Sequence, residues 1–361
     1  MNKKYFIVTF GCQANEADSE LIAAYYEKNG WKEVKSAEEA DELVFNSCSV
    51  RESAENRVIG QIYQIDKRKK KQKKNTPKII LTGCMTGHDK KYLQRKIPGL
   101  NKIWPIGKYS AGLSPKRKQK KQALVQIMTG CDNYCTYCVV PYSRGREKSR
   151  PIEAIYCEVK KLVKEGCDTV MLLGQNVNSY HKNTEFKIKN LELRGKASQL
   201  KKKYKNNFAV LLAILNDIEG LKKIKFLSSN PQDLTDGVIE AMALPKVDRY
   251  LHLAMQSGDD KILKAMNRKH SSLEFYNLVK KIRRKIPGIK IGTDIIVGFP
   301  GESQKQFNNT LRWCRKIGFC KAYVARYSPR EQTAAYKLKD DVPAAEKKRR
   351  WKILDKLINK K

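Results

Sequence analysis

Three cysteines lie close together in residues 130–138, whose sequence is GCDNYCTYC. Cys131, Cys135 and Cys138, here called the loop trio, follow the spacing CxxxCxxC. Three thiolates so placed suit a four-iron cluster in which one iron has no protein ligand and can bind a reacting molecule. A zinc site is the alternative, but zinc normally takes four ligands and no histidine is near in the sequence. We therefore predict a reactive iron–sulfur cluster at this stretch.

Three other cysteines, here called the strand-end trio, share a position relative to predicted strands: Cys12, Cys48 and Cys84. Each comes just after a short apolar stretch, and these stretches are residues 5–10, 43–45 and 79–82. Helical patterns begin near residues 17 and 53, and the alternation indicates a parallel α/β sheet. Because the carboxyl ends of parallel strands lie along one edge, residues distant in sequence can meet there. A lone cysteine in this place is usually a small buried hydrophobe, but three in the same placement predict a second cluster.

The elements that must position the loop trio form a second alternating series. We predict six strands, at residues 125–128, 170–173, 224–227, 250–254, 289–296 and 321–327. With helical stretches between them they indicate a barrel or part of one. The polar segment 180–208 interrupts the series and is expected to be an insertion or a flexible loop. The predicted domains are accordingly residues 1–118, residues 119–342 and a basic C-terminal helix at 343–361.

The chain carries more positive charge than solubility requires. Its 74 lysines and arginines against 37 aspartates and glutamates give a formal net charge of +37 over 361 residues. This favours a polyanionic partner such as nucleic acid, with a merely lysine-rich surface as the alternative. No apolar run is long enough for a spanning helix or a signal peptide, so we expect a cytoplasmic protein that is not bound to a membrane.

Two lysine-rich stretches, residues 67–74 and 116–121, are candidate RNA-facing loops, although solvated charge runs are the alternative. The candidate RNA-binding residues in the first are Lys67, Lys69, Lys70 and Lys71.

Ten cysteines in a reducing compartment do not indicate a disulfide framework. The four cysteines outside the two trios, Cys157, Cys167, Cys314 and Cys320, are interpreted as packing residues.

Motifs along the sequence resemble those of bacterial tRNA methylthiotransferases over nearly the whole chain. They are residues 10–19 (FGCQANEADS), 46–52 (NSCSVRE), 130–147, 172–180 (LLGQNVNSY), 252–258 (HLAMQSG), 264–268 (KAMNR), 293–302 (TDIIVGFPGE) and 327–330 (YSPR). Chance does not produce so many motifs in this order.

The resemblance implies an N-terminal parallel α/β methylthiotransferase domain, in which the strand-end trio holds an auxiliary [4Fe-4S] cluster. A radical SAM domain with a partial (β/α)6 barrel would follow, its [4Fe-4S] cluster held by the loop trio. S-adenosylmethionine (SAM) would serve twice, as the methyl donor to a sulfur and as the source of a radical that removes hydrogen from an adenine carbon. The implied substrate is N6-isopentenyladenosine beside the anticodon of tRNA. The implied partners are tRNA, an external electron donor and a sulfur donor, and we expect a monomer.

Individual residues are further candidates under this resemblance. The candidates for binding SAM are Tyr137, Gly174, Gln256, Asp294, Gly298 and Glu302. The glycines can equally serve turns, and the two acidic residues can equally cap helices. Arg144 and Arg146 follow the loop trio and are candidates for binding RNA, with a structural salt bridge as the alternative. His252 lies in an apolar run and is interpreted as a satisfied core histidine.

The sequence departs from the family pattern at its end. The family usually ends in a small RNA-binding β-barrel, and no strand series follows residue 342, so we expect that domain to be absent. Our hypothesis is that the lysine-rich stretches, the segment 180–208 and the C-terminal helix bind RNA phosphates instead.

Alternative functions remain open at this point. They are a methylthiotransferase that acts on threonylcarbamoyl-adenosine in tRNA or on a ribosomal protein, and a non-catalytic iron–sulfur protein that binds RNA. By resemblance, residues 46–52 favour the isopentenylated substrate. The CxxxCxxC spacing argues against mere binding, which does not need an open iron.

Overall fold

The structure is a computed structural model that describes residues 3–49, 52–72, 77–109, 113–182 and 188–360. The chain divides into two compact units. Unit 1 comprises residues 1–119 together with 139–145, and unit 2 comprises residues 120–138 together with 146–361. The chain therefore leaves unit 1, enters unit 2 and returns to unit 1 for one short segment.

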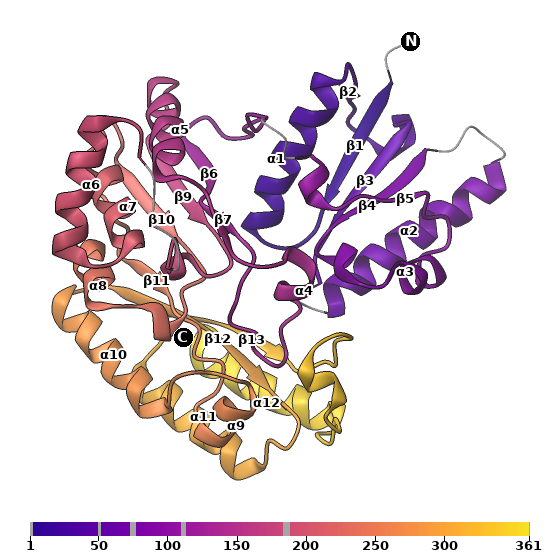
Figure 1. Ribbon diagram of the computed structural model, residues 1–361. Coiled ribbons are helices and arrows are strands. Elements are labelled where there is room, and N and C mark those ends of the chain that lie inside the picture. The colour runs from indigo at the N-terminus through magenta and orange to yellow at the C-terminus, as the bar shows by residue number, and fades with distance from the viewer. Residues whose placement is uncertain (1–2, 50–51, 73–76, 110–112, 183–187, 361) are drawn as a thin grey trace. The chain divides into compact units, whose positions relative to one another are not determined.

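Unit 1 is built on a five-stranded parallel sheet with the order β2-β1-β3-β4-β5 (Figure 1). The strands are β1 (Lys4–Thr9), β2 (Lys32–Glu33), β3 (Glu42–Ser47), β4 (Lys78–Gly83) and β5 (Lys102–Ile103). The predicted parallel sheet is confirmed, and its three predicted strands are the neighbours β1, β3 and β4. The two edge strands β2 and β5 are too short to show an apolar pattern in the sequence.

Helices cover both faces of this sheet, which explains why its central strands are apolar throughout. The helix α1 (Gln13–Lys28) packs Ile22 and Tyr26 against Val44 of β3. The helix α2 (Glu52–Gln72) packs Val58 against Leu43, which points to the opposite face. The shorter elements are η1 (Ala37–Glu39), η2 (Cys84–Gly87), α3 (Lys90–Lys96), η3 (Ile106–Lys108) and α4 (Val140–Arg144).

Unit 2 contains the six predicted barrel strands, which pair in parallel (Figure 1). They are β6 (Gln122–Gln126), β9 (Thr169–Leu173), β10 (Lys223–Phe226), β11 (Tyr250–His252), β12 (Lys290–Val297) and β13 (Lys321–Arg326). They form the sheets β10-β9-β6 and β11-β12-β13, and a parallel bridge between Ser229 and Leu253 links the two. The strands thus follow one another in chain order, as in a partial (β/α)6 barrel. A small antiparallel pair, β7 (Met128–Thr129) and β8 (Lys148–Ser149), flanks the loop trio.

The helices of unit 2 surround these strands, and most share one buried core with them. They are α5 (Ile152–Lys164), α6 (Leu191–Tyr204), α7 (Asn207–Asn216), α8 (Asp236–Met242), α9 (Asp260–Ala265), α10 (Ser272–Lys285), α11 (Gln304–Ile317) and α12 (Ala344–Asn359), with the 3-10 turns η4 (Val177–Ser179), η5 (Pro231–Asp233) and η6 (Ala334–Lys337). For example, Phe275 of α10 and Phe307 of α11 belong to the same buried core as Ile291 of β12. None of the helices in the described ranges is both long and apolar enough to cross a bilayer.

The structure corrects two predictions about basic segments. Residues 191–204 form α6, whose Leu193, Ala197 and Tyr204 are buried, so much of the segment 180–208 is an ordinary barrel helix rather than a loop. The stretch 67–74 begins inside α2, because lysine and arginine favour helix, and residues 73–76 lie outside the described residues. Residues 183–187 of the first segment also lie outside the described residues.

Candidate cluster and SAM sites

The strand-end trio occupies three neighbouring loops at the carboxyl edge of the unit 1 sheet. Cys12 directly precedes α1, Cys48 follows β3, and Cys84 begins η2 directly after β4. Because β3 lies between β1 and β4, these loops emerge side by side. The fold therefore gives all three cysteines the placement that a shared site requires.

Two glycines let these loops approach one another closely. Gly11 has φ +118°, and a Cβ on it would lie 2.8 Å from the Cβ of Cys48. Gly83 has φ +82°, and a Cβ on it would lie 2.4 Å from the backbone oxygen of Ser47. A side chain at either position would collide, so only glycine fits beside Cys12 and Cys84. The chain next to each of these cysteines thus touches the chain around Cys48.

A buried amide network fixes the same loops. The side-chain nitrogen of Asn15 donates to Oδ1 of Asn46 at 3.0 Å and to the backbone oxygen of Ser47 at 2.9 Å. Nδ2 of Asn46 donates in return to the backbone oxygen of Asn15 at 2.7 Å, and both side chains are fully buried. The thiol of Cys12 donates to Oδ1 of Asn15 at 3.6 Å. These asparagines belong to the motifs 10–19 and 46–52, so the motifs act by holding the loops of the trio.

The cysteine side chains themselves are not in ligand geometry. Among the residues that the structure describes, no three His, Cys, Asp or Glu side chains converge as metal ligands would. Cys48 and Cys84 are buried, whereas Cys12 is exposed. The structure therefore gathers the three loops without gathering the three sulfurs. The donor set nevertheless fits an iron–sulfur cluster, because such clusters are held by cysteine thiolates.

The loop trio lies on an irregular turn after β7. The backbone nitrogen of Cys138 donates to the backbone oxygen of Cys135 at 3.0 Å. Nδ2 of Asn133 donates to Sγ of Cys131 at 3.4 Å, and Nη1 of Arg268 donates to Sγ of Cys135 at 3.5 Å. Hydrogen bonds to the sulfurs help set a cluster's reduction potential. The motif 264–268 by itself gives Arg268 no role, because its partner is 133 positions away.

Burial raises the pKa of Cys131 on this turn and that of Glu147, which ends the same motif. Burial raises the pKa of the Cys131 thiol to about 11, although the backbone N–H of Asn133 opposes the rise. A metal that binds Cys131 must therefore displace a tightly held proton. Burial also raises the pKa of Glu147 to about 6, against a hydrogen bond from the Ser179 hydroxyl at 2.6 Å. Glu147 ends the motif 130–147 and had no predicted role.

Buried polar atoms without partners occur at the carboxyl ends of neighbouring barrel strands. In the described part of the chain they include Oε1 of Gln175, Oδ1 of Asn176, Oγ of Ser229 and Oε1 of Gln256. They lie on the loops that follow β9, β10 and β11. Buried polar atoms are normally hydrogen-bonded, so this group indicates a site for a ligand that carries donors. The amino group and ribose hydroxyls of SAM are such donors, and the residues therefore fit SAM.

Three of the predicted SAM residues have a local geometry that suits a ligand pocket. Gln256 is among the unpartnered residues and adopts φ +70°. A Cβ on Gly174 would lie 2.4 Å from Cγ of Met128, so this strand end accepts no side chain. Tyr137 packs beside buried Met266 and Phe299. A contact of these residues with SAM stays a prediction.

Asp294 has a partner inside unit 2. Its Oδ2 lies 2.8 Å from Nε2 of His252, and Nδ1 of His252 lies 3.0 Å from the hydroxyl of Tyr250. His252 is buried and both of its ring nitrogens are engaged, so the prediction of a satisfied histidine is confirmed. The carboxylate of Asp294 is 39% exposed, which leaves it open to a ligand as well. Its role toward SAM stays a prediction.

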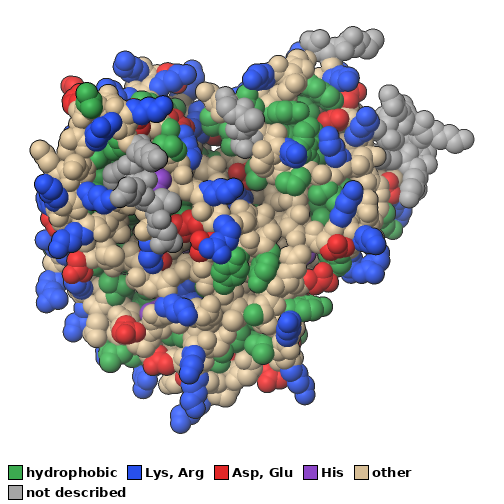
Figure 2. All heavy atoms as spheres, in the orientation of Figure 1, with side chains coloured by type: hydrophobic (Ala, Val, Ile, Leu, Met, Phe, Trp, Pro, Cys, Tyr) green, Lys and Arg blue, Asp and Glu red, His purple; other side chains and the backbone are tan. Residues whose placement is uncertain are grey.

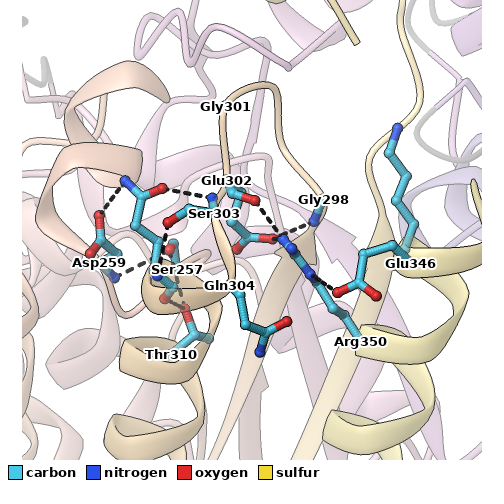
Figure 3. A network of polar contacts seen from close by, with 12 residues as sticks. Ser257, Asp259, Gly298, Gly301, Glu302, Ser303, Gln304, Thr310, Glu346 and Arg350 are labelled. Atoms are coloured by element: carbon cyan, nitrogen blue, oxygen red, sulfur yellow. Dashed lines mark hydrogen bonds and ion pairs between the residues drawn. The ribbon is translucent and has the colours of Figure 1, made fainter. Parts of the chain in front are cut away.

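Glu302 has structural partners within unit 2 (Figure 3). Oε2 of Glu302 accepts from the backbone nitrogen of Gly298 at 2.6 Å and from Nη1 of Arg350 at 2.8 Å. The Glu302 side chain is 1% exposed, and Arg350 also binds Glu346 on its own helix at 2.7 Å. Glu302 therefore joins the loop after β12 to α12, and its role toward SAM stays a prediction. Gly298, at φ +69°, serves this turn, since a Cβ there would lie 2.3 Å from Cγ of Lys347.

The two arginines after the loop trio have different environments. Arg144 belongs to unit 1, where its Nη2 donates to Oδ2 of Asp18 at 2.7 Å and its side chain is 5% exposed. The salt bridge that was the alternative is thus present, and a role of Arg144 toward RNA stays a prediction. Arg146 is 71% exposed, with Nε 2.9 Å from Oδ1 of Asp132, and its role toward RNA stays a prediction.

The basic stretches differ in how far their charges are engaged by acidic partners. In the second stretch Lys116 bonds to Glu27 and Glu33, and Nη1 of Arg117 donates to Oε2 of Glu20 at 2.9 Å. In the first stretch Lys67 is exposed, and nothing is described of the side chains of Lys69, Lys70 and Lys71. Figure 2 shows Lys and Arg side chains spread over the whole visible face with acidic side chains between them. On this face the positive charge is therefore spread out rather than confined to one patch.

Two known protein families match separate parts of the chain. The model of the radical SAM superfamily matches residues 125–314, and that of the Uncharacterized protein family UPF0004 matches residues 4–104. A radical SAM methyltransferase from Kitasatospora setae, solved with cobalamin and a [4Fe-4S] cluster bound, is similar in fold with a TM-score of 0.59. It is 12% identical, and the match covers 93% of this chain and 77% of that one. This likeness confirms the fold.

Closer relatives are similar over nearly the whole chain. The tRNA-2-methylthio-N(6)-dimethylallyladenosine synthase of Dehalococcoides mccartyi strain BAV1 is 42% identical, over 98% of this chain and 82% of the relative. The enzyme of the same name from Clostridium novyi is 40% identical, over 99% of this chain and 81% of the relative. The chain therefore belongs to the radical SAM superfamily and, within it, to the family of tRNA-2-methylthio-N6-dimethylallyladenosine synthases.

Proposed function

We propose that this chain is a radical SAM methylthiotransferase that adds a 2-methylthio group to N6-isopentenyladenosine, also called N6-dimethylallyladenosine, beside the anticodon of tRNA. One observation carries the proposal. The chain has one cysteine trio on the neighbouring strand ends of unit 1 and a second trio with CxxxCxxC spacing in unit 2, in a sequence 42% identical to a synthase of that name.

The residues of the chain have distinct roles in this proposal. The strand-end trio holds an auxiliary [4Fe-4S] cluster, and the loop trio holds the [4Fe-4S] cluster that binds SAM. These groups supply the electron transfer, sulfur and radical chemistry that side chains cannot perform. Asn15 and Asn46 fix the loops of the strand-end trio. Gln256 and its unpartnered neighbours orient SAM at the strand ends of the barrel.

The proposal includes partners and a compartment. The substrate is tRNA, and the enzyme needs an external electron donor and a sulfur donor, since its residues supply neither. We infer a monomer that works in the cytoplasm and not on a membrane. A reducing compartment is in keeping with ten cysteines for which the described part of the chain forms no disulfide.

The test is a nucleoside analysis after anaerobic reconstitution with iron and sulfide. The protein is incubated with SAM, a reductant, sulfide as the sulfur donor, and tRNA that carries either N6-isopentenyladenosine or threonylcarbamoyl-adenosine. We expect the 2-methylthio nucleoside from the first tRNA and none from the second. SAM cleavage without a methylthio product on either tRNA would overturn the proposed substrate. The absence of any SAM cleavage would overturn the enzyme assignment.

The affinity for tRNA is expected to fall steeply with salt, because binding to phosphates releases counterions. Lys348 and Lys352 are exposed on α12, and replacing either by glutamine removes one positive charge that can face a phosphate. Each replacement is expected to reduce the slope of log K against log salt by about one. K116Q is the matched control, since Lys116 is already bonded to Glu27 and Glu33. Filter binding over a salt series measures the slopes. A shallow slope for the unmodified protein would contradict the expectation.

A further inference from the structure

The short segment by which the chain returns to unit 1 contacts Cys84, a cysteine of the strand-end trio. Residues 139–145 directly follow the loop trio in sequence, yet they belong to unit 1. There α4 packs on η2 so closely that a Cβ on Gly87 would lie 2.6 Å from Cα of Ser143. The close backbone approach fixes α4 over the turn that begins with Cys84.

This packing places Arg144 against sulfur. Nε of Arg144 donates to Sγ of Cys84 at 3.3 Å, while Nη2 donates to Oδ2 of Asp18 at 2.7 Å. The Arg144 side chain is 5% exposed and that of Asp18 is 1% exposed. One edge of the guanidinium thus faces a carboxylate and its Nε–H faces the thiol, so the planar group is oriented by two partners.

Stability alone does not account for such a pair. Burying two charges costs about as much as their attraction returns, and an apolar pair of similar volume is often as stable. The position beside a predicted cluster ligand gives the pair a second role. A cation that hydrogen-bonds to a ligating sulfur stabilises the added negative charge of a reduced cluster.

We propose that Arg144 is a positioning residue of the auxiliary cluster and raises the reduction potential of this cluster through its hydrogen bond to Cys84. Asp18 fixes the Arg144 guanidinium in place, and its negative charge limits the rise in potential. The inference rests on the proposed function, since it requires a cluster at the strand-end trio. It predicts opposite effects of two changes that each remove one charge. R144Q removes the positive charge and lowers the potential, whereas D18N removes the negative charge and raises it.

The experiment uses the full chain with the loop trio replaced by alanine, so that any remaining cluster belongs to the strand-end trio. Iron is counted first, and the potential is then measured by a redox titration followed by electron paramagnetic resonance. At a fixed potential, we expect R144Q to lower the ratio of reduced to oxidised cluster about tenfold, which is ~59 mV for a one-electron couple. D18N is expected to raise the ratio. The matched control is R117Q, which alters another ion pair of α1, the one between Arg117 and Glu20.

The outcomes separate this inference from the proposed function. About four irons per chain and potentials in the order R144Q, unmodified protein, D18N would support it. The same iron content with equal potentials would overturn the role of Arg144 and leave the cluster assignment intact. No iron in the unmodified background would overturn the cluster assignment itself. If R144Q fails to fold, R144K takes its place, because it keeps the positive charge beside Asp18 but loses the Nε–H that faces the sulfur. An unchanged potential in R144K would overturn the role of the hydrogen bond.

Discussion

Alanine at all three positions of the strand-end trio is expected to leave a protein that still cleaves SAM but no longer transfers a methylthio group. Alanine at the loop trio is expected to abolish both activities. The reason is that the two trios lie on separate elements, the strand ends of unit 1 and the turn after β7 in unit 2, so that each can hold its group without the other. Each triple variant should keep about four of about eight irons per chain.

The measurement combines iron counting, release of 5′-deoxyadenosine and nucleoside analysis on the same preparations. The control is a C157A/C320A variant, which changes two exposed cysteines outside both trios and should behave as the unmodified protein. Cys167 and Cys314 are unsuitable controls because they are buried in the unit 2 core. Methylthio transfer by the strand-end variant would show that the unit 1 cysteines hold no essential group.

Removing the Arg350 side chain is expected to destabilise unit 2 by about 3–5 kcal/mol, the usual effect of leaving a buried charge unpaired. In R350A the Glu302 carboxylate would keep only the Gly298 N–H while remaining nearly inaccessible to water. Burial already raises the pKa of Glu302 above its ordinary value, with Arg350 opposing the rise. Arg350 also joins α12 to the loop after β12 through its bonds to Glu302, so its loss removes this attachment.

The adjacent residue supplies the matched control. Arg349 is about half-exposed and bonds to the same Glu346 at 2.7 Å, so R349A should cost at most about 1 kcal/mol. Denaturant unfolding is followed by the fluorescence of Trp351, which lies on α12 and donates to the backbone oxygen of Val324 at 2.9 Å. Equal losses in the two variants would contradict the structural role assigned to the Glu302–Arg350 pair.

Much of the fold could be predicted because the central strands of both units are short apolar runs between polar segments. The strand ends then placed Cys12, Cys48 and Cys84 correctly along one sheet edge. The two-residue strands gave no pattern, and the charged sequence of α6 and of the end of α2 concealed their helices. Helix formation there depends on propensity and tertiary packing, which a search for apolar periodicity does not detect.

The chemistry of single charged residues was less accessible from sequence. Arg144 and Asp18 are 126 positions apart, and Glu302 and Arg350 are 48 positions apart. No local spacing connects such partners. Arg144 and Glu302 were therefore assigned to external ligands, although each forms an ion pair within the protein. Gln256 was chosen because it lies at a strand end, and its role toward SAM stays a prediction. Arg268 was not considered, because only the folded chain brings it to Cys135.

The return of residues 139–145 to unit 1 has a consequence for how the protein is made. A chain emerging from the ribosome can form the sheet of unit 1 once β5 is complete, but α4 is synthesised only after the loop trio. Until Arg144 emerges, Asp18 lacks its cation and η2 lacks its cover. A fragment that stops at residue 119 would keep this immature form permanently, so studies of the N-terminal half by itself need residues 139–145 supplied as well.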